Sequence, residues 1–148
     1  MSRHLLFISV ASLAIGSGAA GTTASPNLKW SAAPPSLPAG AHMAVVSGDP
    51  GKAEMFKIEL KMPAGYAVPA HWHPTDETVK VVSGKIGYGM TAKLDKAHAK
   101  WGAAGAKVTM KAKMHHWVFA NAPAMIEVSG MGPFQISYVD PKNDPRKN

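Results

Sequence analysis

A chain of 148 residues has the length of one domain and is large enough to bury a core without disulfides. Its 46% hydrophobic and 17% charged residues indicate a globular protein rather than a disordered one. Cysteine is absent, which excludes a disulfide framework and a thiolate site, so any metal ion must be held by nitrogen and oxygen ligands.

The formal net charge is +7 and is carried mainly by lysines that are scattered along the chain. No block of five or six like charges occurs, and no nucleic-acid-binding motif accompanies the lysines. We interpret them as a solvated basic surface and expect no nucleic-acid partner. The alternative is that they attract an acidic ligand or an anionic surface.

The first 24 residues have the pattern of a secretory signal peptide. Arg3 precedes an apolar run over 5–15, and small residues then offer cleavage after Ala20 or Ala24. The apolar run is shorter than the roughly 20 residues that span a bilayer, so we expect no stable membrane anchor. A retained N-terminal anchor is the alternative. The pattern predicts a periplasmic or secreted protein.

Residues 25–52 are rich in Pro, Ala, Gly and Ser and predict an irregular N-terminal arm, with one short strand at 44–46. Residues 54–62 predict a half-buried strand, because apolar and charged residues alternate along them. Further short strands are predicted at 68–73, 78–82, 85–91, 106–110, 116–120, 125–129 and 134–139. Many short strands separated by turn residues predict an all-β sandwich or barrel in a single domain.

One segment between these strands has helical spacing. Residues 93–105 place Leu94, Ala97, His98 and Trp101 at i, i+3, i+4 and i+7, which predicts one or two helical turns. Beyond the last strand, residues 141–148 are expected to form a polar C-terminal tail.

Two histidines and a carboxylate lie close together after the first strand. His71 and His73 are two residues apart, so on a strand they project from one face and Trp72 from the other. Pro74 ends the strand, and a short turn can bring Glu77 back toward the histidines. Two imidazoles and a carboxylate have the chemistry of a metal site. The alternative is a pair of surface histidines.

The spacing of these residues resembles the first motif of the cupin superfamily. In that family a glycine is followed by five residues, His-x-His, three or four residues, Glu, six residues and a second glycine. The chain matches every position of this pattern, with Gly65, His71, His73, Glu77 and Gly84. The resemblance extends over about residues 56–139 and implies that the two histidines and the glutamate are metal ligands.

The second motif of the family supplies one further histidine, and the chain matches it less closely. The family pattern is glycine, five residues, Pro-x-Gly, two residues, His, three residues and Asn. On this chain the pattern begins at Gly105 and its histidine falls on His116. Lys111 and Lys113 stand where the family has Pro and Gly, and Asn121 lies one place late. These departures concern the geometry of the turn rather than the presence of the histidine.

The fourth ligand has to be chosen between two adjacent histidines. His115 and His116 face opposite sides of a strand, so only one of them can enter the cavity. The motif selects His116, which makes His115 a rim, outer or supporting residue. His42 and His98 are interpreted as solvated or packing residues.

Several other side chains have two interpretations. Asp76 could compete with Glu77 as a ligand, but we interpret it as a turn residue. Lys111 and Lys113 are interpreted as solvated turn residues; the alternative is that one of them faces the cavity mouth and pairs with an anionic substrate. Four aromatic residues are candidates for the cavity wall or the outer surface: Trp72, Tyr88, Trp117 and Phe119.

The resemblance implies a single cupin double-stranded β-helix, a jelly-roll barrel, over residues 53–140. It also implies one divalent metal ion, held by His71, His73, Glu77 and His116. Iron, manganese, nickel, copper and zinc all suit these ligands. The implied function is that of a dioxygenase, isomerase or lyase for a small oxygenated organic substrate. The alternative is a non-catalytic module that binds a metal or small molecule. Because the family often forms dimers, we expect a homodimer.

Overall fold

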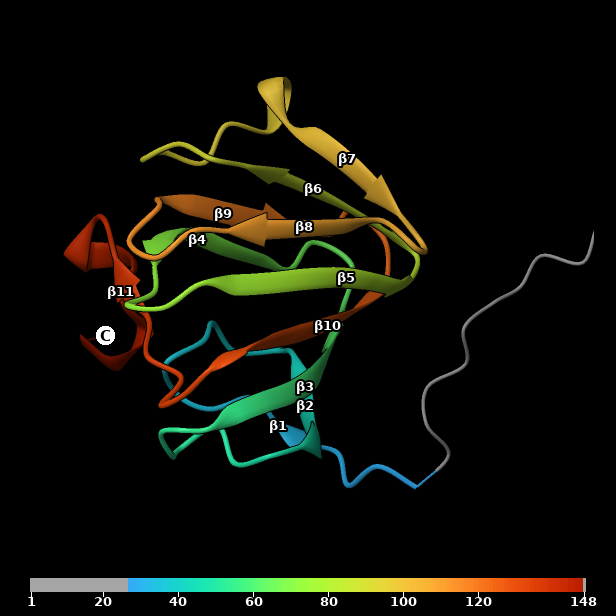
Figure 1. The fold of residues 1–148 in the computed structure, drawn as a ribbon. Coiled ribbons are helices and arrows are strands. Elements are labelled where there is room, and N and C mark those ends of the chain that lie inside the picture. Colours follow the sequence, from blue (N-terminus) through green and yellow to red (C-terminus); the bar gives the residue numbers. More distant parts are fainter. Residues whose placement is uncertain (1–26, 148) are drawn as a thin grey trace, which may run out of the picture.

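Two antiparallel sheets face each other across an apolar core in the computed structural model, which describes residues 27–147 (Figure 1). The predicted signal peptide at 1–24 lies outside the described residues. The strands in chain order are β1 (Ser31–Ala32), β2 (His42–Ser47), β3 (Met55–Met62), β4 (Ala67–Trp72), β5 (Glu77–Ser83), β6 (Lys85–Gly89), β7 (Lys100–Ala103), β8 (Lys107–Met110), β9 (His116–Phe119), β10 (Ala124–Met131) and β11 (Ser137–Tyr138).

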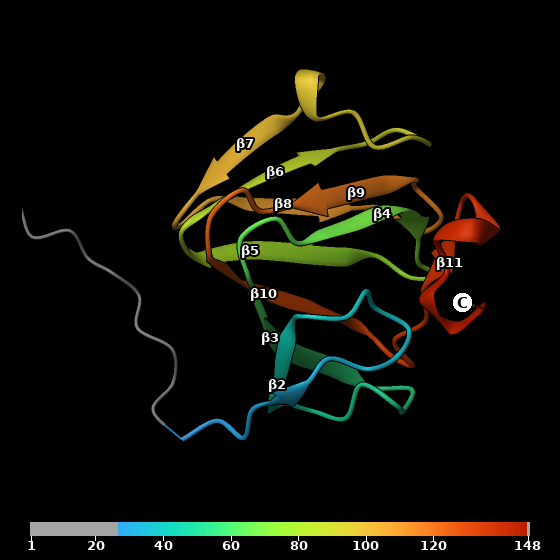
Figure 2. The same ribbon diagram turned by 180° about the vertical axis from the view of Figure 1, so that it is seen from behind.

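One sheet has the strand order β1-β2-β3-β10-β5-β8 and the other the order β11-β4-β9-β6-β7. Strands that follow one another in the chain therefore often lie in different sheets, as β4 and β5 do. The view from behind shows the N-terminal strands β1 and β2 extending the first sheet beyond β3 (Figure 2). This arrangement confirms the predicted all-β jelly roll.

The core is formed by alternate residues of the strands. On β3 the side chains of Phe56, Ile58, Leu60 and Met62 are buried between the sheets, while Lys61 is exposed. This is the alternation expected of strands with one face toward the core. Burial of these side chains is the main source of stability, at about 25 cal/mol per Å² of apolar surface.

The N-terminal arm is more regular than expected. The short strand predicted at 44–46 extends over His42–Ser47 and pairs with β3. Ser31–Ala32 pairs in turn with β2. Two small residues of this segment, Ala41 and Ala44, are almost fully buried, so the arm packs closely against the sheet. A composition of small residues thus predicts little local structure but permits close packing.

The predicted helical segment is confined to a 3-10 turn, η1 (Lys96–His98). The prediction of helix over the rest of the segment is wrong, because Lys100–Ala103 forms the strand β7. In that strand Trp101 lies opposite Gly87 of β6. Pairing with β6 places the Trp101 ring at 5.3 Å from the Phe119 ring, in an edge-to-face contact. The pairing of this segment with β6 outweighs its helical spacing, which consisted of only four residues.

The C-terminal segment contains two further 3-10 turns, η2 (Pro141–Asn143) and η3 (Pro145–Lys147). The guanidinium of Arg146 donates to the Asp144 carboxylate at 2.7 Å and to the Ile136 carbonyl at 3.1 Å. The tail is therefore attached to the barrel near β11. Within 27–147, the helical segments are too short to cross a bilayer.

Candidate metal centre

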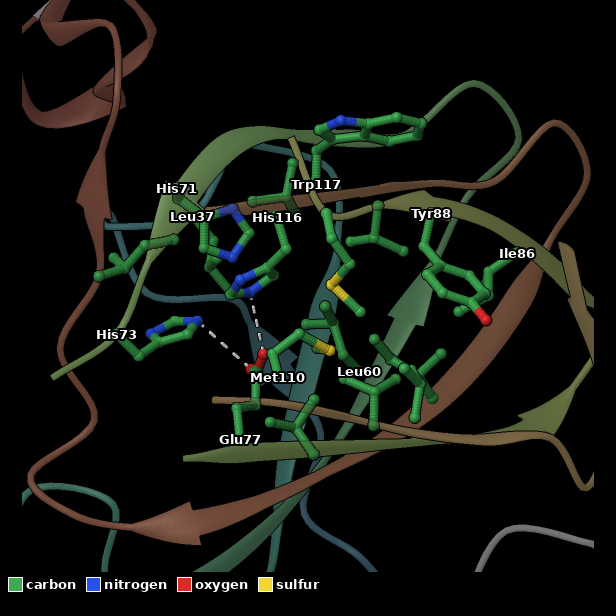
Figure 3. A pocket seen from close by; sticks show the side chains of 18 of the residues that line it. Leu37, Leu60, His71, His73, Glu77, Ile86, Tyr88, Met110, His116 and Trp117 are labelled. Atoms are coloured by element: carbon green, nitrogen blue, oxygen red, sulfur yellow. Dashed lines mark ion pairs between the residues drawn. The ribbon is translucent and has the colours of Figure 1, made fainter. Parts of the chain in front are cut away.

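The fold brings the four predicted site residues together at one end of the space between the sheets (Figure 3). His71 on β4 and His116 on β9 are directly opposite in the strand pairing. His73 follows the end of β4, and Glu77 begins β5 in the other sheet. All four side chains are buried, and one donor atom of each lies within 4.8 Å of the others.

Backbone carbonyls fix the orientation of each imidazole. Nδ1 of His71 lies 2.7 Å from the Pro69 carbonyl oxygen, Nδ1 of His73 lies 2.6 Å from that of Gln135, and Nδ1 of His116 lies 2.9 Å from that of Met114. A carbonyl only accepts hydrogen bonds, so each Nδ1 carries the proton. In the neutral ring, each Nε2 then has a free lone pair, which is the arrangement found in metal-ligating histidines.

The Nε2 atoms lack the partners that buried polar atoms normally have. Nε2 of His73 and Nε2 of His116 have no hydrogen-bond partner among the described residues. They lie 3.4 and 3.1 Å from the two carboxylate oxygens of Glu77 (Figure 3). Donors that each lie about 2.1 Å from one ion are at most about 4.2 Å apart. Small side-chain rotations would therefore let the group hold a divalent ion.

The surroundings also favour, for His71 and Glu77, the ionisation states that a metal ion requires. Burial, with His116 and His73 nearby, lowers the pKa of His71 to about 3, so this ring is neutral at pH 7. Burial opposes ionisation of Glu77, but contact with His116 and the proximity of His73 outweigh it and lower the pKa of the carboxyl. Neutral imidazoles and an ionised carboxylate are the forms that bind metal ions.

The glycines of the two motifs occupy tight turns. Gly65, Gly84 and Gly105 have φ of +81°, +74° and +91°, a region that side chains with a Cβ rarely adopt. Lys113, which stands where the family has glycine, has φ of +64°. The departure from the motif has therefore left the turn geometry in place. The Lys113 amide donates to the His73 carbonyl oxygen at 2.7 Å and links the two motifs.

The other histidines within residues 27–147 lie outside the group. His115 is exposed and lies just before β9, whereas His116 begins β9 and is buried. His42 is exposed on β2, and His98 is exposed with its Nδ1 2.7 Å from an Asp95 oxygen.

The acidic and basic residues of the adjoining turns are also excluded from the group. Asp76 accepts from Lys111 Nζ and from the Ala112 amide, both at 2.8 Å, and so stabilises the turn. Lys113 is exposed, and neither lysine lines the cavity. The interpretation of both lysines as solvated turn residues therefore fits the structure better than a role at the cavity mouth.

The four candidate aromatic residues have different positions. Tyr88 and Trp117 border the cavity, and the indole N–H of Trp117 donates to Thr91 Oγ1 at 2.8 Å. Phe119 belongs to a separate cluster with Trp117 and Ala70. Trp72 is half-buried and does not line the cavity.

Two residues that support His73 were not predicted as part of the site. The Phe134 ring stacks on the His73 ring, with centroids 5.1 Å apart and planes inclined by 24°. The carbonyl that orients His73 belongs to Gln135. A backbone carbonyl leaves no signal in the sequence, because every residue has one. The apolar stretch around Phe134 predicted only a strand.

Comparisons with known proteins agree with the fold. No family model matches the chain, and no curated protein matches it in sequence. A protein from Methylibium petroleiphilum PM1 assigned as an acetylacetone dioxygenase matches in structure with a TM-score of 0.63 and 15% identity, over 95% of this chain and 90% of that one. The polyketide cyclase RemF from Streptomyces resistomycificus matches with a TM-score of 0.59 and 14% identity, over 72% and 76%.

An RmlC-like cupin from Shewanella frigidimarina matches with a TM-score of 0.57 and 11% identity, over 74% of this chain and 87% of that one. Structural similarity at sequence identities this low establishes a common fold and leaves the activity open. The two facing antiparallel sheets and these structural likenesses show that the chain has the fold of the cupin superfamily.

Proposed function

We propose that this protein is an exported, mononuclear metal enzyme that acts on a small oxygenated organic substrate. His71, His73, Glu77 and His116 would hold one divalent ion. The observation that supports this proposal most strongly is the pair of buried Nε2 atoms, of His73 and His116, that have no hydrogen-bond partner among residues 27–147 and face the Glu77 carboxylate. A buried polar atom without a partner is costly, and a shared cation would satisfy both.

The reaction that we propose is of the dioxygenase type. Four protein donors leave two positions of an octahedral ion for small molecules, which suits a reaction between an oxygenated substrate and dioxygen. A bound ion supplies Lewis-acid polarisation and, for a redox-active metal, electron exchange. The similarity to the Methylibium protein, which extends over nearly the whole of both chains, supports this choice over isomerase or lyase chemistry.

Metal analysis of protein purified from its native compartment tests the site. We expect about one divalent ion per chain in the wild type and a loss of most of it in His71→Ala and His116→Ala. His115→Ala is the matched control and should keep its metal, because His115 is exposed beside His116. If His71→Ala and His116→Ala kept the wild-type metal content, the ligand assignment would be wrong.

Oxygen uptake with a panel of β-dicarbonyls and catechols tests the activity. A non-catalytic metal- or small-molecule-binding module is the second candidate, favoured by the small volume of the cavity and the burial of all four side chains. A metal-loaded protein that consumes no oxygen with any member of the panel would support the binding module.

Export is the part of the proposal that rests on the N-terminal sequence alone. A basic start, a short apolar run and small residues up to Ala24 support it. Expression of the full chain in a bacterial host should give a processed protein in the periplasmic or external fraction. Its N-terminal residue, read by mass spectrometry, should be Gly21 or Ser25. A protein that stays unprocessed in the cytoplasm would contradict export.

A further inference from the structure

The cavity beyond the four donors is almost entirely apolar. It has a volume of about 50 Å³, which corresponds to a few water-sized groups. Its wall includes Leu60, Val108, Met110 and Ile126, drawn from β3, β8 and β10 of one sheet. Among the described residues that line it, no Lys, Arg, Ser, Thr, Asn or Gln is present. A ligand with several polar groups would find few partners there.

One hydroxyl remains on the cavity wall. Tyr88, on β6, lies across the cavity from Glu77 (Figure 3). The Trp117 indole lies on the face of β9 opposite to His116, and its N–H already donates to Thr91. Unpaired polar groups of a ligand cost free energy in such surroundings, since they lose their hydrogen bonds to water.

The charge of the site limits the charge of its ligand. Metal ligation through Nε2 requires neutral imidazoles, whose Nδ1 protons the carbonyls accept, and Glu77 would contribute one negative charge. With a divalent ion, the group would carry one net positive charge. A monoanion would neutralise it, whereas a dianion would leave a buried negative charge without a cation nearby. The lysines of the turn before His116, Lys111 and Lys113, are exposed and do not line the cavity.

Met110 limits the space beside the carboxylate. It is directly opposite Glu77 in the pairing of β5 and β8, is buried, and lines the cavity. Residues paired in this way have Cβ atoms about 5 Å apart on one face of the sheet. The Met110 side chain therefore occupies volume that the body of a larger ligand would need.

From these observations we propose that the cavity selects a small oxygen chelate with one negative charge and an apolar body. The enolate of a β-diketone has this chemistry; sugar acids and dicarboxylates do not. The inference rests on the proposed metal site and adds the substrate class to it. We also propose that the Met110 side chain limits the size of the substrate.

Acetylacetone and malonate form a matched pair of probes. Both can present two oxygens separated by three carbons, but acetylacetone carries two methyl groups and binds as a monoanion, whereas malonate is a dianion. We would load the mature protein with Co(II), exclude oxygen, and titrate each probe while following the visible spectrum of the ion. Gel filtration and metal analysis afterwards would show that neither probe has removed the ion.

We expect acetylacetone to bind at least about tenfold more tightly than malonate, because the additional charge of malonate would be buried without a partner. Equal or tighter binding of malonate would overturn the proposed substrate class. Failure of the protein to bind Co(II) at all would overturn the proposed function instead. A spectrum that neither probe changes would overturn the substrate class while leaving the metal site standing.

A larger diketone tests the role of Met110. We expect Met110→Ala to lower the Kd of 1-phenyl-1,3-butanedione at least about tenfold, with little change for acetylacetone, because the truncation enlarges the cavity. Met110→Val, a smaller truncation, should give an intermediate gain if the alanine variant does not fold. Met55→Ala, at a position 61% exposed, is the control and should leave both constants unchanged. If the ratio of the Kd of 1-phenyl-1,3-butanedione to the Kd of acetylacetone were the same in all three folded variants, the assignment to Met110 would be overturned.

Discussion

Lys113 shows how one residue can depart from a motif while the backbone keeps the geometry of that motif. Its φ of +64° lies in the left-handed region, which costs a residue with a Cβ about 1–2 kcal/mol. The turn that contains it is held by the Lys113 amide, which donates to the His73 carbonyl, and by the Asp76 carboxylate, which accepts from Ala112. These contacts join the segment before His116 to the segment that carries His73 and Glu77.

Replacement of Lys113 by glycine should stabilise the protein. Lys113→Gly removes the backbone strain but increases the entropy of the unfolded chain, so we expect a net gain of about 0.5–1 kcal/mol in the free energy of unfolding. Urea denaturation measures it. Lys113→Ala removes the same charge and keeps the strain, and it should give no gain. Equal stabilisation by glycine and alanine would point to the charge rather than to φ.

The strands β6 and β9 position the site through close packing of glycines against aromatic rings. A Cβ on Gly89 would lie 2.2 Å from the Trp117 ring, and one on Gly87 would lie 2.3 Å from the Phe119 ring. Both distances are too short for real contacts. The two glycines therefore let β9 keep its aromatic residues on one face and His116 on the other.

Gly89→Ala should destabilise the fold. The added methyl group overpacks the contact with Trp117, which typically costs 1–3 kcal/mol, and the lower entropy of the unfolded chain offsets part of that cost. We expect a net loss of about 1–2 kcal/mol in urea denaturation. Gly51→Ala is the control, because its nearest atom is a flexible Asp49 side-chain oxygen at 3.3 Å. A Gly89→Ala protein as stable as the control would show that the ring moves aside without cost.

In the molecule as a whole, the candidate metal centre joins the two sheets. His71 and His116 belong to the five-stranded sheet, and Glu77 belongs to the six-stranded one. A metal ion held by all of them would connect sheets that are otherwise joined by apolar packing and by the loops between them.

Metal binding should therefore raise the melting temperature. At a free metal concentration of 100 times Kd the folded state gains about 2.7 kcal/mol, which for a chain of this size corresponds to a rise of roughly 5–10 °C. Differential scanning calorimetry with and without a chelator measures the effect. A double variant, His71→Ala with His116→Ala, should show no rise. The same rise in that variant would place the bound metal elsewhere.

Much of this molecule could be predicted from local patterns. Strand alternation depends on neighbouring residues, so the pattern at Phe56, Ile58 and Leu60 predicted β3 closely. The spacing of His71, His73 and Glu77 predicted three of the four candidate ligands, because these three residues lie close together in the sequence. Residues 93–105 were predicted less well, since a helical spacing and an edge strand differ only in whether a partner such as β6 is present.

Other features depend on contacts between distant segments. The placement of His116 opposite His71, the carbonyl of Gln135 that orients His73, and the truncation of the last strand to Ser137–Tyr138 all arise from pairing across many residues. The cavity wall is another such feature: its residues come from both sheets, and their common position follows only from the fold. The homodimer stays a prediction.

The amino-acid sequence alone predicts His71, His73, Glu77 and the motif glycines, because strand parity and tight turns are local properties of the backbone. The choice of His116 over His115 required the alternation of side chains along a strand together with the spacing of the second cupin motif. Of these two histidines, the structure places only His116 in the cavity. The apolar lining of the cavity and the absence of a lysine from it became apparent only when both sheets were assembled. Burial is a property of the packed chain: it keeps His71 neutral and limits the volume of the site, while the neighbouring histidines favour the ionised form of Glu77.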